Sequence, residues 1–151
     1  MDIQNAERLI ALFYPEDTPL KRLLLRHSEQ VQEKALEIAK LSGVEVDVNV
    51  VAAGAMLHDI GIFRCKAAGI QCYGTEPYIC HGTIGAQLLL EQGFPQHARV
   101  CERHTGAGIT ERQIVEQNFP IPPRDLAARL YRGLCRCWET ACGAGPSQSP
   151  G

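Results

Sequence analysis

The stretch "AMLHDIGIF", residues 55–63, places a histidine and an aspartate side by side among apolar residues. Burying two ionisable groups in such surroundings is costly unless each finds a partner. The preceding residues, 47–54 (DVNVVAAG), begin with a good N-cap residue, Asp47, and are apolar on almost every side of a helix. This pattern predicts a short, buried helix at the centre of the fold, with His58 and Asp59 at its end.

Helical patterns lie on both sides of this central segment. Residues 18–43 begin with Thr18 and Pro19, which suit an N-cap and a first helical position, and end at Gly43, which suits a left-handed stop. No alternating period-two pattern competes with the helical one, so we expect an all-α, single-domain helical bundle. The other expected helices are 5–15, 75–93, 95–106 and one that opens with a capping box at 110–113, and a loop is expected at 61–75.

The chain changes character after Pro123. Residues 124–151 are rich in arginine and cysteine and finish in a Gly/Pro/Ser segment. Leucines at 126, 130 and 134 predict one more amphipathic helix, whereas residues 142–151 are expected to be disordered. The expected domain therefore spans residues 1–141, with a disordered tail at 142–151.

Composition narrows the class of protein. The chain has 151 residues, enough for one domain, with 45% apolar and 21% charged residues. A net charge of -2 gives no sign of a nucleic-acid clamp, and no apolar run reaches membrane-spanning length. The N-terminal residues are acidic and polar where a signal peptide carries positive charge, so we expect a cytoplasmic protein. The seven cysteines, an odd number without a C-x-x-C pair, are expected to be free thiols, with a zinc knuckle as the less favoured alternative.

Histidines are the strongest chemical signal. A single histidine on an apolar helix face is usually a core residue with one hydrogen bond. Here four histidines fall on four different expected helices, together with one carboxylate, and such a set is harder to explain as core filling. Neutral imidazole is a frequent metal ligand, and helical bundles build metal sites from inward-facing side chains. The candidate metal ligands are His27, His58, Asp59, His81 and His104.

The adjacent pair His58-Asp59 limits the geometry of such a site. Neighbouring side chains on a helix point about 100° apart, so they can share an ion only near the helix end. One oxygen of Asp59 can then serve a first ion and the other oxygen a second, which fits either one or two metals. The alternative is structural: His58 faces the helix dipole, and Asp59 caps the next turn.

The order of these residues resembles the HD-domain superfamily of metal-dependent phosphohydrolases, in its HDIG variant. The segment 23–39 (LLLRHSEQVQEKALEIA) is similar to the helix that bears the family's first histidine. The segment 103–110 (RHTGAGIT) is similar to the one that bears its late histidine. The similarity covers about residues 20–125, and the combination of motifs is far more specific than the "HD" pair alone.

This resemblance implies an HD-type helical bundle with one or two divalent metal ions that hydrolyses phosphate esters or nucleotides. By that match, His27, His58 and Asp59 would hold one ion, and Asp59, His81 and His104 a second. His58 and Asp59 would be the catalytic pair. The ligand types suit iron, manganese, zinc, cobalt or nickel. Some relatives with this ligand set look like di-iron oxygenases, which keeps a second enzyme class open.

The sequence departs from the family in its C-terminal part. Family members carry a further aspartate on a late helix, and the only aspartate here after Asp59 is Asp125, which comes too early. A catalytically inactive metal- or ligand-binding module is therefore a further alternative. If the protein is a hydrolase, its partner is a small phosphorylated molecule or nucleotide, with Lys66 and Arg103 as candidate phosphate contacts. The remaining histidine, His97, is expected at the surface.

Overall fold

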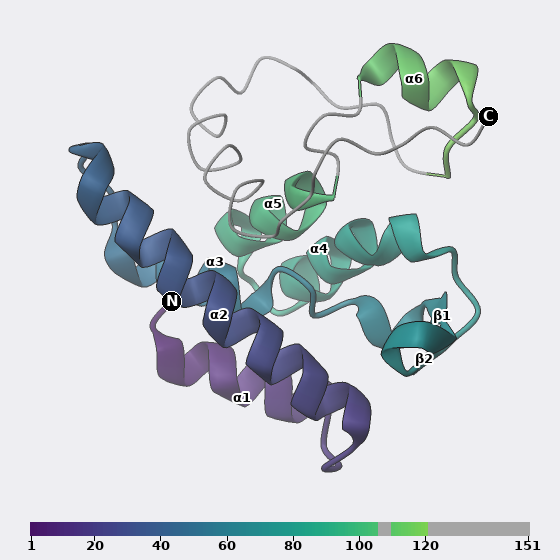
Figure 1. The fold of residues 1–151 in the computed structure, drawn as a ribbon, viewed down its shortest axis with the longest axis horizontal. Helices are drawn as coiled ribbons and strands as arrows, with labels where there is room; N and C mark the ends of the chain where they lie inside the picture. The colour runs from purple at the N-terminus through teal and green to yellow at the C-terminus, as the bar shows by residue number, and fades with distance from the viewer. Residues whose placement is uncertain (106–109, 121–151) are drawn as a thin grey trace.

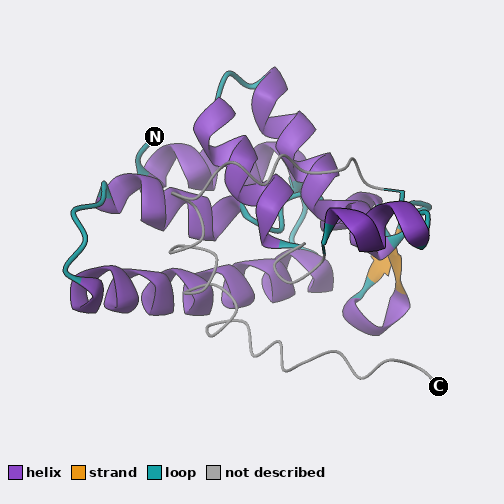
Figure 2. Cartoon of the chain, turned by 90° about the horizontal axis from the view of Figure 1, so that it is seen from above, coloured by secondary structure: helices purple, strands orange, loops and turns teal. Residues whose placement is uncertain are grey.

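The computed structural model describes residues 1–105 and 110–120, and within them it forms a bundle of helices (Figure 1). Figure 2 shows the longest helix running along one side of the bundle, with a small two-stranded sheet at one edge. The α-helices are α1 (Ile3–Phe13), α2 (Pro19–Ser42), α3 (Val48–Leu57), α4 (His81–Glu91), α5 (Pro95–His104) and α6 (Glu111–Glu116). The strands are β1 (Lys66–Ala67) and β2 (Cys72–Tyr73), and short 3-10 helices span Ile62–Arg64, Ala68–Ile70 and Tyr78–Cys80.

The expected all-α class and the expected helix caps are confirmed. Thr18 accepts a hydrogen bond from the backbone N–H of Lys21, and Gly43 ends α2 with a φ of 66°. Asp47 caps α3 by accepting from two backbone N–H groups. None of the helices in the described part of the chain is both long and apolar enough to cross a membrane.

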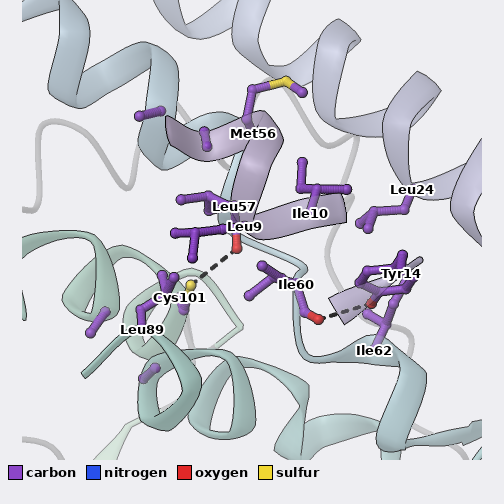
Figure 3. Packing of buried hydrophobic residues seen from close by; sticks show 14 of the residues in the cluster. Leu9, Ile10, Tyr14, Leu24, Met56, Leu57, Ile60, Ile62, Leu89 and Cys101 are labelled. Carbon is purple, nitrogen blue, oxygen red and sulfur yellow. Dashed lines mark hydrogen bonds between the residues drawn. The ribbon is translucent and has the colours of Figure 1, made fainter. Parts of the chain in front are cut away.

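Helix α3 lies at the centre of the packing, in contact with α1, α2 and α5. Its residues are apolar on nearly all sides, and Leu57 is completely buried. The main core gathers where α3 ends and the chain turns towards α4, as Figure 3 shows. There the thiol of Cys101 on α5 donates to the backbone carbonyl of Leu57, with a sulfur–oxygen distance of 3.2 Å. The end of α3, where His58 and Asp59 lie, is thus held inside the core.

Two glycines permit a close approach of backbones around this point. A Cβ atom on Gly61 would lie 2.3 Å from the carbonyl oxygen of His81. A Cβ atom on Gly82 would lie 2.4 Å from the carbonyl oxygen of Cys101. Since any larger residue would meet backbone at both places, glycine lets the turn after Asp59 pack on α4 and lets α4 pack on α5.

The segment expected as a loop at 61–75 is more ordered than predicted, and the expected helix 75–93 begins only at His81. The strands pair antiparallel, with Lys66 opposite Tyr73. The backbone N–H groups of Thr75 and Glu76 both donate to the Arg64 carbonyl at 3.0 Å. These bonds, together with the extended conformation that a proline at 77 favours for the preceding residue, delay the start of the helix.

The prediction for His97 was wrong, because this histidine is only 3% exposed and not a surface residue. It lies on the buried face of α5 with Ala98 and Cys101. Its ring meets the ring of Phe94 edge to face, with centroids 6.3 Å apart. The expected helix and tail within 124–151, including Asp125, lie outside the described residues.

The hydroxyl of Tyr14 ties the end of α1 to the turn that follows Asp59. Tyr14 is 5% exposed, and its hydroxyl donates to the backbone carbonyl of Ile60 at 2.8 Å (Figure 3). Burial raises the pKa of this phenol, so it remains a hydrogen-bond donor.

Replacing Tyr14 with phenylalanine should therefore destabilise the fold by about 1–3 kcal/mol, because a buried carbonyl loses its hydrogen bond. Urea unfolding of the metal-free protein measures the change. The matched control is Tyr73→Phe, since Tyr73 is 73% exposed and its loss should cost less than about 0.5 kcal/mol. Equal effects of the two substitutions would contradict the role given to Tyr14.

Candidate metal centre

Four imidazole rings from four helical segments converge on the carboxylate of Asp59. His27 lies on α2, His58 follows the last residue of α3, His81 begins α4 and His104 ends α5. The distances from each Nε2 atom to the nearer carboxylate oxygen are 3.1 Å for His81 and 2.9 Å for His104 at Oδ1, and 3.4 Å for His27 and 3.2 Å for His58 at Oδ2.

Three of these imidazoles are held in the same way by their own backbone. In each, Nδ1 donates to the carbonyl of the residue three positions earlier. Because a carbonyl can only accept, these hydrogen bonds assign the proton to Nδ1 and leave a lone pair on Nε2 of the neutral ring. The pairs are His58 with Ala55 at 2.7 Å, His81 with Tyr78 at 2.5 Å, and His104 with Cys101 at 2.7 Å.

The Nε2 atoms also lie close to one another. The Nε2 atoms of His27 and His58 are 3.2 Å apart, and those of His81 and His104 are 3.0 Å apart. Lone pairs that face one another and a carboxylate at such distances repel unless a positive charge lies among them. A proton or a metal cation can supply that charge.

Protons supply this positive charge only in part. Burial raises the pKa of the Asp59 carboxyl. The neighbouring imidazoles of His58, His104 and His81 outweigh burial, because a proton on any of their Nε2 atoms would supply a charge and a hydrogen bond to the carboxylate, and they hold its pKa well below the usual range. Burial lowers the pKa of His104 to about 4, and it also lowers the pKa of His27, with the neighbouring charge of His58 as the second cause. The carboxylate of Asp59 is therefore ionised, and the added proton is disfavoured on His104 and His27. A carboxylate together with neutral imidazoles is the donor set that a transition-metal ion binds.

The donor atoms fall into two groups of metal-binding size that share Asp59. One contains His27, His58 and Asp59, and the other contains Asp59, His81 and His104; within each group the ligand atoms lie within 4.8 Å of one another. We call these groups the first and the second half-site. The cluster is compatible with divalent metal ions, because a carboxylate with one oxygen towards each half-site can serve two.

The two half-sites differ in exposure. The side chains of His81 and His104 are 7% and 9% exposed, and that of His58 is 1% exposed. The side chain of His27 is 37% exposed. The first half-site is thus open to solvent at His27, whereas the second is enclosed.

The two candidate phosphate contacts lie in different surroundings. Lys66 is an exposed residue of β1, whose backbone N–H donates to the Glu76 carbonyl at 2.8 Å. Arg103 is half-buried in the last turn of α5, immediately before His104. Whether either binds phosphate stays a prediction. Tyr78 was not among the residues predicted for the site, although its ring lies against that of His81 with centroids 4.4 Å apart.

Related proteins share part of this chain. An uncharacterised protein of Methanocaldococcus jannaschii is 41% identical over 106 residues, which are 68% of this chain and 55% of that protein. Two proteins named tRNA (cytidine(56)-2'-O)-methyltransferase are each 36% identical to the present chain over the matched residues. The one from Thermoplasma volcanium matches over 64% of this chain and 25% of its own length, and the one from Picrophilus torridus over 66% and 26%.

The chain thus spans about half the length of the first of these relatives and about a quarter of the other two. No solved structure gives a significant match. The sequence model of the HD domain matches residues 24–134, well over half of the chain, and this segment contains all five residues of the cluster. The chain therefore belongs to the HD-domain family.

Proposed function

We propose that this protein is a metal-dependent phosphohydrolase that acts on a small phosphate ester or nucleotide. One observation carries the proposal: four Nε2 atoms face the two oxygens of one buried carboxylate, and burial disfavours protonation of His104 and His27. A bound divalent ion would lower the pKa of a water molecule towards about 7 and polarise a phosphoryl oxygen. Membership of the HD-domain family supports hydrolase chemistry of this kind.

The chain's own residues would hold and orient the centre. Asp59 serves both half-sites, because Oδ1 faces His81 and His104 while Oδ2 faces His27 and His58. The Nδ1–carbonyl hydrogen bonds fix the direction of three Nε2 lone pairs before any ligand arrives, which limits the reorganisation on binding. The exposed edge of His27 leaves a direction from which a phosphate can approach.

The substrate class is narrowed by charge and by the relatives. A net charge of -2 favours a small phosphorylated molecule over a long polyanion. Two relatives are named as tRNA methyltransferases, which supports nucleotides as the first compounds to test. We further propose that Lys66 and Arg103 help to bind the phosphate, Arg103 from its place beside His104.

Turnover is the first test of the proposal. Protein loaded separately with manganese, zinc, cobalt or iron should release phosphate from members of a panel of nucleotides and phosphomonoesters. Asp59→Asn should lower kcat/KM by at least about 100-fold, since changes around metal ligands alone commonly cost 10–100-fold. Metal retention without turnover on any compound would favour a binding module. Oxygen consumption by an iron-loaded protein would favour an oxygenase.

Metal content should respond differently to the two kinds of ligand substitution. Asp59→Asn should remove metal from both half-sites, because both use this carboxylate. His27→Ala should remove metal from the first half-site only. Elemental analysis after dialysis gives the content of each variant. His97→Gln is the matched control, since His97 is buried but does not belong to the cluster, and it should keep the full content. Equal losses in His27→Ala and Asp59→Asn would contradict the assignment of two half-sites.

The metal-free protein should lose stability in mild acid. His104 has a pKa of about 4 in the fold, against an ordinary value of about 6.5 in the unfolded chain. Between these values the unfolded chain binds more protons, so the free energy of unfolding should fall as the pH falls from about 6.5 to about 4. The loss due to Asp59 begins only near and below the ordinary carboxyl pKa, because its pKa is lowered.

Urea unfolding in the presence of a chelator, between about pH 7 and about pH 4.5, measures this dependence. The variant His104→Gln should show a weaker dependence, since it lacks the depressed imidazole. A free energy of unfolding that stays constant or rises as the pH falls would contradict the assignment.

A further inference from the structure

Tyr78 contacts His81 in two ways. Its backbone carbonyl accepts the Nδ1–H of His81 at 2.5 Å. Its phenol ring lies against the imidazole of the same residue, with centroids 4.4 Å apart and planes inclined by 30°. Tyr78 thus fixes the tautomer of His81 through its carbonyl and covers one face of the His81 ring with its side chain.

The other anchored histidines have a different environment. Ala55 and Cys101 supply the carbonyls for His58 and His104, and neither has an aromatic side chain. The ring of His58 meets that of His104 at 89°, and the rings of His81 and His104 meet at 62°. Among the ring contacts of the cluster within the described residues, the contact of Tyr78 with His81 is the closest to parallel.

We propose that Tyr78 is a positioning residue of the second half-site, which acts through His81 to strengthen metal binding there. This inference rests on the metal centre of the proposed function. An imidazole that donates its Nε2 lone pair to a cation becomes more positive. The electron-rich face of a phenol ring then favours the metal-bound state over the metal-free state, as in a cation–π interaction. The ring also restricts rotation of the imidazole, so less conformational freedom is lost on binding.

Local structure keeps the carbonyl of Tyr78 in place whatever its side chain. Tyr78 begins the 3-10 helix that leads into α4, directly after Pro77, whose φ is -56°. The N–H of Cys80 donates to the Pro77 carbonyl at 2.9 Å, and the Cys80 side chain is buried. The Tyr78 residue itself is 41% exposed, so its side chain can be changed with little disturbance of the core.

The test measures Co²⁺ affinity by calorimetry and by the visible absorption of the bound ion. Tyr78→Leu removes the aromatic face and keeps an apolar side chain, whereas Tyr78→Phe keeps the face. Each is made in the His27→Ala background, which isolates the second half-site, and in the His104→Ala background, which retains the ligands of the first. Tyr73→Leu is the matched control, because Tyr73 is an exposed tyrosine close by in the chain whose hydroxyl donates to Gln71.

In the His27→Ala background, Tyr78→Leu should weaken Co²⁺ binding about tenfold relative to His27→Ala alone and should alter the visible spectrum. Tyr78→Phe and Tyr73→Leu should keep the Co²⁺ affinity within about twofold of that of His27→Ala alone. In the His104→Ala background, Tyr78→Leu should have no effect. Unchanged affinity of Tyr78→Leu, or equal losses in both backgrounds or in Tyr73→Leu, would overturn the inference and leave the proposed function standing. Absence of Co²⁺ binding by the unsubstituted protein would overturn both.

Discussion

A single negative charge in the protein interior governs the structure around it. The residue Asp59 is only 8% exposed, yet the pKa of its carboxyl is held well below the usual range. A buried ion is tolerated only when positive charge or hydrogen-bond donors surround it. Here the surroundings are imidazoles, which are common metal ligands, and burial lowers the pKa of two of them, His104 and His27. The energetic cost of burying Asp59 and the metal-binding character of the cluster are therefore two aspects of the same arrangement.

The ends of helices supply the geometry that this charge needs. The last carbonyls of a helix lack partners within the helix. The imidazoles of His58 and His104 satisfy such carbonyls at the ends of α3 and α5. The same hydrogen bond that completes the helix end also fixes the tautomer and aims Nε2 at Asp59. Glycines at 61 and 82 then let these helix ends approach closely, so that secondary structure, packing and ligand direction depend on one another.

Features with a local cause could be predicted from the sequence, and features with a tertiary cause could not. The caps at Thr18, Gly43 and Asp47 follow from backbone chemistry within a few residues, and the structure shows all three. The five clustered side chains share inward positions on predicted helices, and the structure brings them together. Strands of two residues leave no periodic signal, so the β1–β2 pair was missed. The burial of His97 depends on which face of α5 packs inward, which its own short segment does not specify.

The two half-sites differ in their exposure to solvent, and this difference determines the side from which a ligand can reach the cluster. In the second half-site both imidazoles are anchored to backbone carbonyls and enclosed, so their lone pairs are in place before a ligand binds. In the first half-site the side chain of His27 is 37% exposed, whereas that of His58 is only 1% exposed. Solvent therefore reaches the cluster from the side of α2. Because Asp59 belongs to both half-sites, any charge drawn to the open side also acts on the enclosed one.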